Sequence, residues 1–275
     1  MTLINTFILA VLQGLTEFLP VSSSGHLVII QNFLGLKNIP VLFDLILHLG
    51  TVSAVIIVYY KIIRDILKDL FLWAGKGKKE KETVTSRGNV KLFFYIFLST
   101  VVTGIIGMVF KDIIKSFFYK PGFVPLFLFV TGIILLTTKF LSVRNREIGQ
   151  IKVDYPVIIG GIQAIAMLPG ISRSGSTIAA GLFLGASRRF SGMYSFLIAV
   201  PSVFGASLFE FISTRNIALS SLDLGTISIA FTISFLTGYG SLKLLIRFLT
   251  KGKLYLFSFY CFAAGILGLI FISRM

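Results

Sequence analysis

Long apolar runs alternate with short polar connections along most of the chain. Six runs are long enough to cross a bilayer as helices, which takes about 20 apolar residues. The pattern therefore predicts membrane-spanning helices at 39–60, 92–110, 122–140, 190–212, 223–243 and 253–273. Because the runs are continuous and do not alternate apolar with polar residues, they predict helices and not the strands of a membrane barrel.

Two further segments, 1–36 and 155–187, are apolar but interrupted. Each is broken by Pro, Gly and Ser, at 20–25 in the first segment and at 169–175 in the second. The stretches on either side of a break are too short to cross a bilayer separately. We therefore predict a re-entrant helix pair in each segment, which enters the membrane, turns at the polar break and leaves on the same side.

The two interrupted segments are related in sequence. Four identical residues recur without a gap at an offset of 150: Gln13 and Gln163, Ser22 and Ser172, Ser24 and Ser174, Gly25 and Gly175. Each segment precedes three predicted spans, which gives two repeats, 1–145 and 150–275, within one membrane domain of 1–275. Since three spans are an odd number, the second repeat is expected to enter from the opposite face. The sequence thus predicts an all-α polytopic membrane protein with an inverted-topology repeat.

The distribution of basic residues gives an independent test of this topology. The chain has 275 residues, a net charge of +15 and 26 Lys and Arg, and its mean hydropathy is +0.92. The connections 61–91, 139–152, 187–189 and 243–253 hold 19 of these bases, against 6 in the opposite connections. The positive-inside rule places the first group in the cytoplasm and both termini outside. Because the bases lie between apolar runs and form no single basic surface, we expect no nucleic-acid partner.

The first break brings ionisable groups into an apolar segment. Gln13 and Glu17 are four residues apart, which puts both on one face of a helix. An intramembrane carboxylate is costly unless it is paired, hydrated or bound to a cation, so Glu17 is either a satisfied buried acid or a site residue. His26 follows Ser23 by three residues, close enough to exchange a proton with it or with a bound phosphate. Together these groups favour a site.

The serines of the first break also precede a helix. The hydroxyls of Ser22, Ser23 and Ser24 and the free backbone N–H groups there can bind an anion at the positive end of the helix dipole. The alternative is that they only cap the helix, and one of them is expected to do so in any case.

The second break contributes Arg173 between Ser172 and Ser174, with Thr177 one turn later. An arginine between apolar helices needs an anionic partner, which is either Glu17 or a ligand. Its guanidinium can bind two phosphate oxygens and neutralise charge during phosphoryl transfer. We therefore expect the two breaks to form one site for a phosphorylated substrate. For three other ionisable residues in or near spans we favour a packing or helix-bridging role: Asp44, His48 and Glu210.

These motifs resemble the bacterial undecaprenyl diphosphate phosphatase family, also known as bacitracin-resistance proteins. The matching segments span the whole chain: 13–26, 47–51, 169–177, 187–188 and 196–201. The resemblance implies a hydrolase that removes the terminal phosphate from undecaprenyl diphosphate. The product is the monophosphate carrier used in peptidoglycan synthesis. The resemblance also implies a bacterial inner-membrane protein whose site opens to the periplasmic or outer face.

The resemblance also implies roles for individual residues. The catalytic residues would be Glu17, Ser23, His26 and Arg173. From their place in or beside the two breaks, we expect the substrate to be bound by Gln13, Ser22, Ser24, Ser172, Ser174 and Thr177. Glu17 would ligate a divalent cation, Mg or Ca; many members have a second Glu at the position of Gln13. Either Ser23 attacks phosphorus while His26 moves the proton, or His26 is the nucleophile. The expected partners are a polyprenyl diphosphate and membrane lipid, and a homodimer is an open alternative.

Three other functions compete with this one. A polyprenyl phosphate transporter or flippase would use the same inverted repeats and the same anion site. The type-2 phosphatidic acid phosphatases share the Ser24-Gly25-His26 element, but they need a histidine downstream of an arginine, and none follows Arg188. A purely structural membrane protein would leave Glu17, His26 and Arg173 unexplained.

Overall fold

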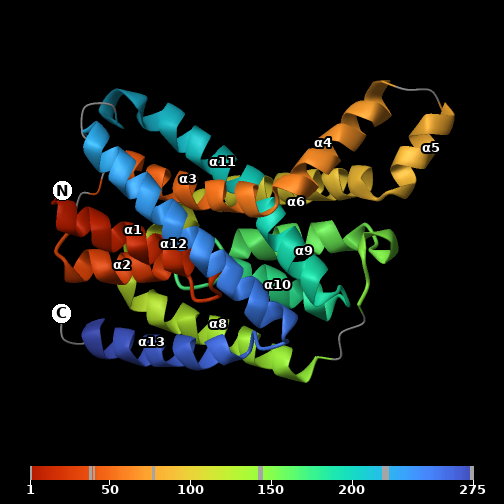
Figure 1. The fold of residues 1–275 in the computed structure, drawn as a ribbon. Coiled ribbons are helices and arrows are strands. Elements are labelled where there is room, and N and C mark those ends of the chain that lie inside the picture. Colours follow the sequence, from red (N-terminus) through yellow and green to blue (C-terminus); the bar gives the residue numbers. More distant parts are fainter. Residues whose placement is uncertain are drawn as a thin grey trace.

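The computed structural model describes residues 2–36, 39, 41–75, 78–141, 145–218 and 223–272, and these residues form a helical bundle (Figure 1). The only β-type pairing among them is an isolated bridge between Arg146 and Ala186. The α-helices, in chain order, are α1 Leu3–Phe18, α2 Ser23–Phe33, α3 Val41–Val58, α4 Tyr60–Gly75, α5 Lys78–Ser86, α6 Asn89–Val109, α7 Lys111–Phe118, α8 Val124–Thr137, α9 Asp154–Ile165, α10 Arg173–Phe183, α11 Arg188–Ala218, α12 Leu224–Thr250 and α13 Leu256–Ile272.

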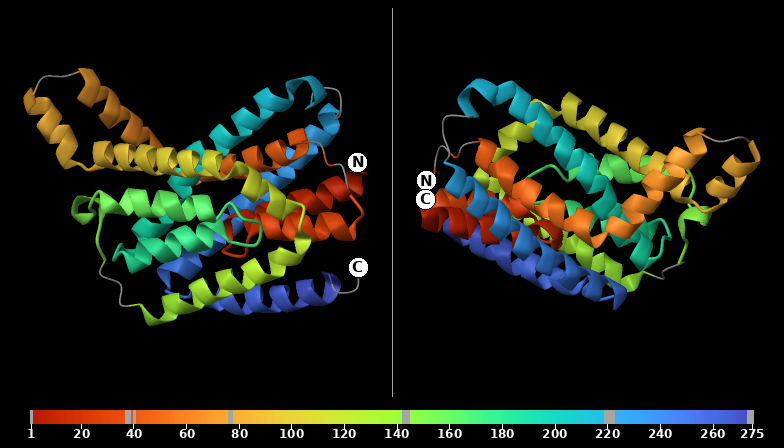
Figure 2. Two further views of the ribbon diagram at one scale, coloured as in Figure 1. Left: turned by 180° about the vertical axis from the view of Figure 1, so that it is seen from behind. Right: turned by 45° about the horizontal axis from the view of Figure 1, so that its top comes forward.

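Both predicted breaks interrupt helices. Helix α1 ends at Phe18 and α2 begins at Ser23, while α9 ends at Ile165 and α10 begins at Arg173. In each pair the two helices lie side by side, and the pairs come from opposite ends of the bundle so that their turns point toward its centre (Figures 1 and 2). The breaks therefore lie deep inside the bundle, where polar groups are shielded from water.

The structure contains helices of membrane-crossing length and composition. Among the described residues, four segments meet that standard: Asn89–Val109, Pro121–Phe140, Arg188–Leu208 and Leu224–Thr250. The run predicted at 39–60 forms α3, which bends by 76° into α4, and this bent pair is a fifth candidate span. The run predicted at 253–273 forms α13, which is apolar but has only 17 residues. The protein is thus an all-helical, multi-pass membrane protein.

The outer surface of the bundle is apolar. Large apolar side chains on α6 and α13 are well exposed, for example Phe97 at 59%, Met108 at 63% and Leu267 at 67%. In water such a surface would be unfavourable, but the hydrocarbon of a bilayer covers it without cost. The exposed phenylalanines are therefore accounted for by lipid contact.

Small residues and hydroxyls let α12 pack tightly against α1 and α3. Ser241 Oγ donates to the Gly14 carbonyl at 2.6 Å, and Ser234 Oγ donates to the Leu47 carbonyl at 2.6 Å. A Cβ on Gly14 would lie 2.7 Å from the Ser234 carbonyl oxygen, so only glycine permits this approach. Membrane helices associate through such close backbone contacts and interhelical hydrogen bonds. The packing fixes α1, which carries Gln13 and Glu17 into the centre of the bundle.

Candidate active site

The turns of the two helix pairs meet backbone to backbone at two glycines. A Cβ on Gly25 would lie 2.9 Å from both the backbone N and the Cα of Gly170. Gly170 has a φ of +106°, a conformation that strains any residue with a side chain. Ser22 Oγ accepts a hydrogen bond from the Gly170 N–H at 3.0 Å and another from the Gly25 N–H at 3.3 Å. The Ser22 hydroxyl therefore caps α2 and also bonds the turn before α10 to the turn before α2.

Helix α8 holds the second turn in place through Thr131. Its hydroxyl donates to the Gly170 carbonyl at 2.9 Å and accepts from the Ser172 N–H at 3.0 Å. Ser172 Oγ in turn caps α10 by accepting from the Gly175 N–H at 3.1 Å. The Gly170 carbonyl and the N–H groups of Ser172 and Gly175 thereby gain partners inside the protein, as the membrane interior favours.

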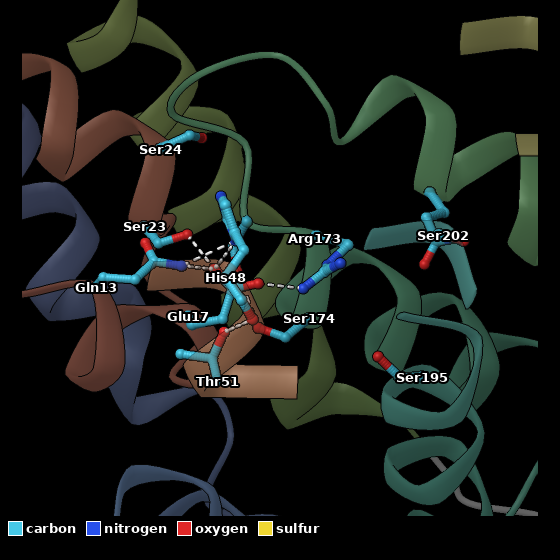
Figure 3. A network of polar contacts seen from close by, with 12 residues as sticks. Gln13, Glu17, Ser23, Ser24, His48, Thr51, Arg173, Ser174, Ser195 and Ser202 are labelled. Carbon is cyan, nitrogen blue, oxygen red and sulfur yellow. Dashed lines mark hydrogen bonds and ion pairs between the residues drawn. The ribbon is translucent and has the colours of Figure 1, made fainter. Parts of the chain in front are cut away.

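Glu17 is the centre of a polar cluster that joins the two breaks (Figure 3). The residue is only 8% exposed. Its Oε2 accepts hydrogen bonds from Ser23 Oγ at 2.6 Å and from Gln13 Nε2 at 2.9 Å, and its Oε1 accepts one from Arg173 Nη2. The carboxylate is therefore paired with the arginine from the other half of the chain, as an intramembrane acid requires. Four of the predicted site residues come together here.

Arg173 retains donors for a ligand. Its side chain is 22% exposed, against 6% for that of Glu17. Among the described residues only the Nη2 nitrogen of the guanidinium has a hydrogen-bond partner, although the group carries five N–H donors. The remaining donors can bind phosphate oxygens beside the Ser23 hydroxyl.

His48 belongs to the same cluster, which the sequence analysis missed by favouring a packing role. Its Nδ1 lies 3.0 Å from Gln13 Nε2 and 3.8 Å from Glu17 Oε2. Its side chain is 35% exposed, so α3 supplies an accessible imidazole at the edge of the site. The available signal was its position in the Leu-His-Leu-Gly-Thr motif at 47–51 and the rarity of ionisable residues within spans. The side chain of Glu210 lies outside the described part of the structure.

His26 lies away from the carboxylate cluster. Its Nδ1 is 2.8 Å from the Ser22 carbonyl, and its Nε2 is 2.8 Å from the Tyr260 hydroxyl. The two rings also stack, with centroids 5.6 Å apart. Both ring nitrogens are thus occupied by groups other than Ser23, and Ser23 donates to Glu17 instead. His26 and Tyr260 line one part of an apolar groove of about 310 Å³ between α2, α8 and α13.

The other predicted substrate-binding residues serve the two turns in this structure. Ser24 Oγ lies 3.4 Å from Ser22 Oγ, and Ser174 Oγ lies 3.3 Å from Ser172 Oγ. Thr177 Oγ1 donates to the Arg173 carbonyl at 2.8 Å and lies 2.6 Å from Ser195 Oγ. These hydroxyls hold the backbone around Arg173 and Ser23, so their observed contacts are structural.

The oxygen donors of the cluster suit a hard divalent cation only in part. Within the described residues there is no group of three or more His, Cys, Asp or Glu that could hold a metal ion. Glu17 is the single carboxylate of the cluster, but Gln13 Oε1 is buried and has no hydrogen-bond partner among the described atoms. Mg²⁺ commonly takes one or two protein oxygens and completes its shell with water and substrate phosphates. Glu17 and Gln13 fit that mode of binding, but they do not form a complete coordination shell made only of protein groups.

A serine, a carboxylate and an arginine at facing helix ends in a multi-pass membrane protein define a candidate site for a phosphorylated substrate. Comparison with known proteins gives the family: residues 6–267 match the model of the family described as bacitracin resistance protein BacA, and the chain belongs to that family.

Relatives that carry a functional name agree along the whole chain. Proteins named undecaprenyl-diphosphatase are 38% identical in Halothermothrix orenii, covering 98% of both chains, and 39% identical in Desulfosudis oleivorans, covering 95% of this chain and 96% of the relative. A third, from Methanosphaera stadtmanae, is 36% identical over 98% of this chain and 97% of its own.

Proposed function

We propose that this protein is an undecaprenyl-diphosphatase, which hydrolyses undecaprenyl diphosphate to undecaprenyl phosphate and inorganic phosphate. The observation that carries the proposal is that Ser23 and Arg173, from opposite halves of the chain, both donate hydrogen bonds to the buried carboxylate of Glu17. A nucleophile, a base and a phosphate-binding cation are thereby held at one point. Membership of the family and the names of its full-length relatives support the same activity.

In the proposed reaction, Ser23 Oγ attacks the terminal phosphorus and its proton passes to Glu17 Oε2, which already accepts its hydrogen bond at 2.6 Å. The bond from that phosphorus to the bridging oxygen breaks, and undecaprenyl phosphate leaves. Water then cleaves the phosphoserine, releasing phosphate and restoring the hydroxyl. Arg173 balances the charge on the transferring phosphoryl group throughout, since such reactions depend mainly on positioning and electrostatic stabilisation.

Of the two nucleophiles that the sequence left open, we favour Ser23. It is the residue bonded to a base, whereas both nitrogens of His26 face other partners. His26 lines the apolar groove beside α13, and we propose that it contacts the substrate where the diphosphate joins the prenyl chain. His26 would then contribute to substrate binding but would not form the covalent bond to phosphorus.

We propose that Mg²⁺ or Ca²⁺ binds at Glu17 and Gln13 together with the substrate. When bound, the cation would neutralise diphosphate charge at the point where Arg173 and Ser23 meet. The support is the orphan oxygen of Gln13, which has no other partner among the described atoms.

We further propose that the two halves form an inverted repeat whose site opens to the outer face. The equivalent caps support the repeat: Ser22 accepts from the Gly25 N–H, and Ser172 accepts from the Gly175 N–H. The orientation rests on the distribution of basic residues. The connections with most of the Lys and Arg, which include α4 and α5, lie at the same end of the bundle as the turn between α10 and α11 (Figure 1), and the positive-inside rule places that end in the cytoplasm.

Labelling of cysteines introduced at Glu82 and Lys115, in sealed vesicles, would test this orientation. Equal accessibility of both from one side would contradict the orientation.

The first test of the function is phosphate release from undecaprenyl diphosphate by the purified protein in detergent. We expect release with Mg²⁺ or Ca²⁺, its loss on addition of a chelator, and its recovery when the metal is restored. A pure carrier of polyprenyl phosphate would release none. Absence of release from folded protein, with melting temperature as the measure of folding, would contradict the proposal.

His48 is expected to support the reaction by orienting Gln13 and Glu17. Replacing His48 with alanine should lower kcat by about tenfold to a hundredfold, the usual range for a positioned group next to the reacting atoms. KM should change much less, because His48 contacts protein groups and not the substrate. His48→Gln, which can still accept a hydrogen bond from Gln13, should recover a large part of the rate. Equal losses in both variants would contradict a role through Gln13.

A further inference from the structure

A second cavity lies at the end of the bundle where α3 bends into α4. It has a volume of about 590 Å³ and is formed by the bend at 57–62, the first turns of α11 and the last turns of α12. Most of its lining is apolar, including Ile57, Ile246 and Leu249. The carboxylate cluster lies elsewhere, because none of its residues lines this cavity.

Two basic residues give this cavity its charge. Lys61 and Arg189 both line it, and its lining contains no carboxylate. Other described arginines, including Arg64, Arg87 and Arg173, form ion pairs with Asp65, Asp69 and Glu17. No ion pair is seen for Lys61 or Arg189 among the described residues. The cavity thus combines an uncompensated positive charge with an apolar wall.

The sequence beside the cavity is typical of the lipid head-group region. The bend carries Tyr59, Tyr60 and Lys61 in succession, and aromatic residues followed by basic ones are typical of the boundary between hydrocarbon and water. Beyond this bend α4 turns out of the bundle (Figure 1). Lys61 and Arg189 are both exposed, so a head group can reach them from the bilayer surface.

We propose that this cavity binds an anionic glycerophospholipid of the surrounding leaflet. Lys61 and Arg189 bind the phosphate, the tyrosine and Thr250 hydroxyls bind other polar atoms of the head group, and one acyl chain lies along Ile57, Ile246 and Leu249. Basic pockets between membrane helices on the side with more positive charge bind such head groups. A free inorganic anion would use the charges but not the apolar wall, and a zwitterionic lipid would not need two uncompensated cations.

The test is native mass spectrometry of the full-length protein with phosphatidylglycerol or with phosphatidylcholine of the same acyl chains. We expect preferential retention of phosphatidylglycerol. Because each basic residue near the surface strengthens binding of anionic lipid by about fivefold, the double variant Lys61→Gln/Arg189→Gln should bind it about thirtyfold more weakly. The control double variant, Lys68→Gln/Lys253→Gln, removes the same charge from exposed residues outside the cavity and should bind normally.

Five outcomes would overturn the proposal. Equal losses in the two double variants would mean general surface attraction, and equal retention of phosphatidylcholine would mean an apolar groove without charge selection. Displacement by millimolar inorganic phosphate would identify a site for free anions. Displacement by equimolar undecaprenyl phosphate would identify the prenyl lipid as the occupant. The double variant Lys61→Arg/Arg189→Lys keeps both charges and should keep binding. It provides the test if the glutamine variant does not fold, and a loss of binding in it would also contradict the proposal.

Discussion

Replacing Arg173 with glutamine is expected to lower kcat for phosphate release by about a thousandfold, because in the proposed reaction its guanidinium neutralises charge on the transferring phosphoryl group. The change also leaves the buried carboxylate of Glu17 without its ion-pair partner. Removal of one partner of a buried pair costs roughly 3 kcal/mol, so the melting temperature should fall as well. Phosphate release and thermal melting in the same detergent would measure both effects.

Two further variants separate catalysis from stability. Glu17→Gln/Arg173→Gln removes both charges, so its melting temperature should recover while its activity stays as low as that of the single variant. Arg64→Gln breaks a solvent-exposed ion pair with Asp65 and should change neither quantity appreciably. An Arg173→Gln protein that keeps kcat within tenfold of the parent would contradict the site as we describe it.

Replacing Ser23 with alanine is expected to reduce phosphate release to the background rate, a loss of at least about a thousandfold, since no other group would form the covalent bond. Rapid quenching of the parent with substrate labelled in its terminal phosphate should trap label on Ser23, and peptide mapping would locate it. Among the described residues the Ser23 hydroxyl forms one hydrogen bond, to Glu17, so the variant should remain folded.

The neighbouring serine provides the matched control. Ser24 has a weak contact with Ser22, at 3.4 Å, and Ser24→Ala should keep most of the activity. His26→Ala should mainly raise KM, because His26 faces the apolar groove and Tyr260. Label on His26, together with an active Ser23→Ala protein, would reverse our choice of nucleophile.

Composition and local pattern were sufficient for several features. Continuous apolar runs can be satisfied in lipid only as helices, so the all-helical class followed from hydropathy alone. The breaks predicted at 20–25 and 169–175 overlap the observed ones at 19–22 and 166–172. They followed from Pro, Gly and Ser, which interrupt helices through their own backbone preferences. The pairing of Glu17 with Arg173 could be predicted as one of two outcomes, because a charge at that depth needs a partner.

Other features depend on contacts between distant segments. The close contact between Gly25 and Gly170 could not be predicted from the sequence. It depends on how α8 and α12 pack against the two helix pairs. The place of His48 beside Gln13 depends on the packing of α3 against α12 and α1, and the turn of His26 toward Tyr260 depends on where α13 lies. None of these distances is encoded in spacing along one helix.

What the sequence alone determined is therefore what local chemistry enforces: membrane helices, two polar breaks and a buried charge that requires a counter-charge. What only the tertiary structure decided is which groups meet at the breaks. Ser23 donates a hydrogen bond to Glu17, whereas His26 contacts Tyr260 instead. His48, on a third helix, contacts Gln13 in the same cluster. The physical reason is that side-chain partners in a bundle are selected by helix packing, and that packing depends on contacts between residues that lie far apart in the chain.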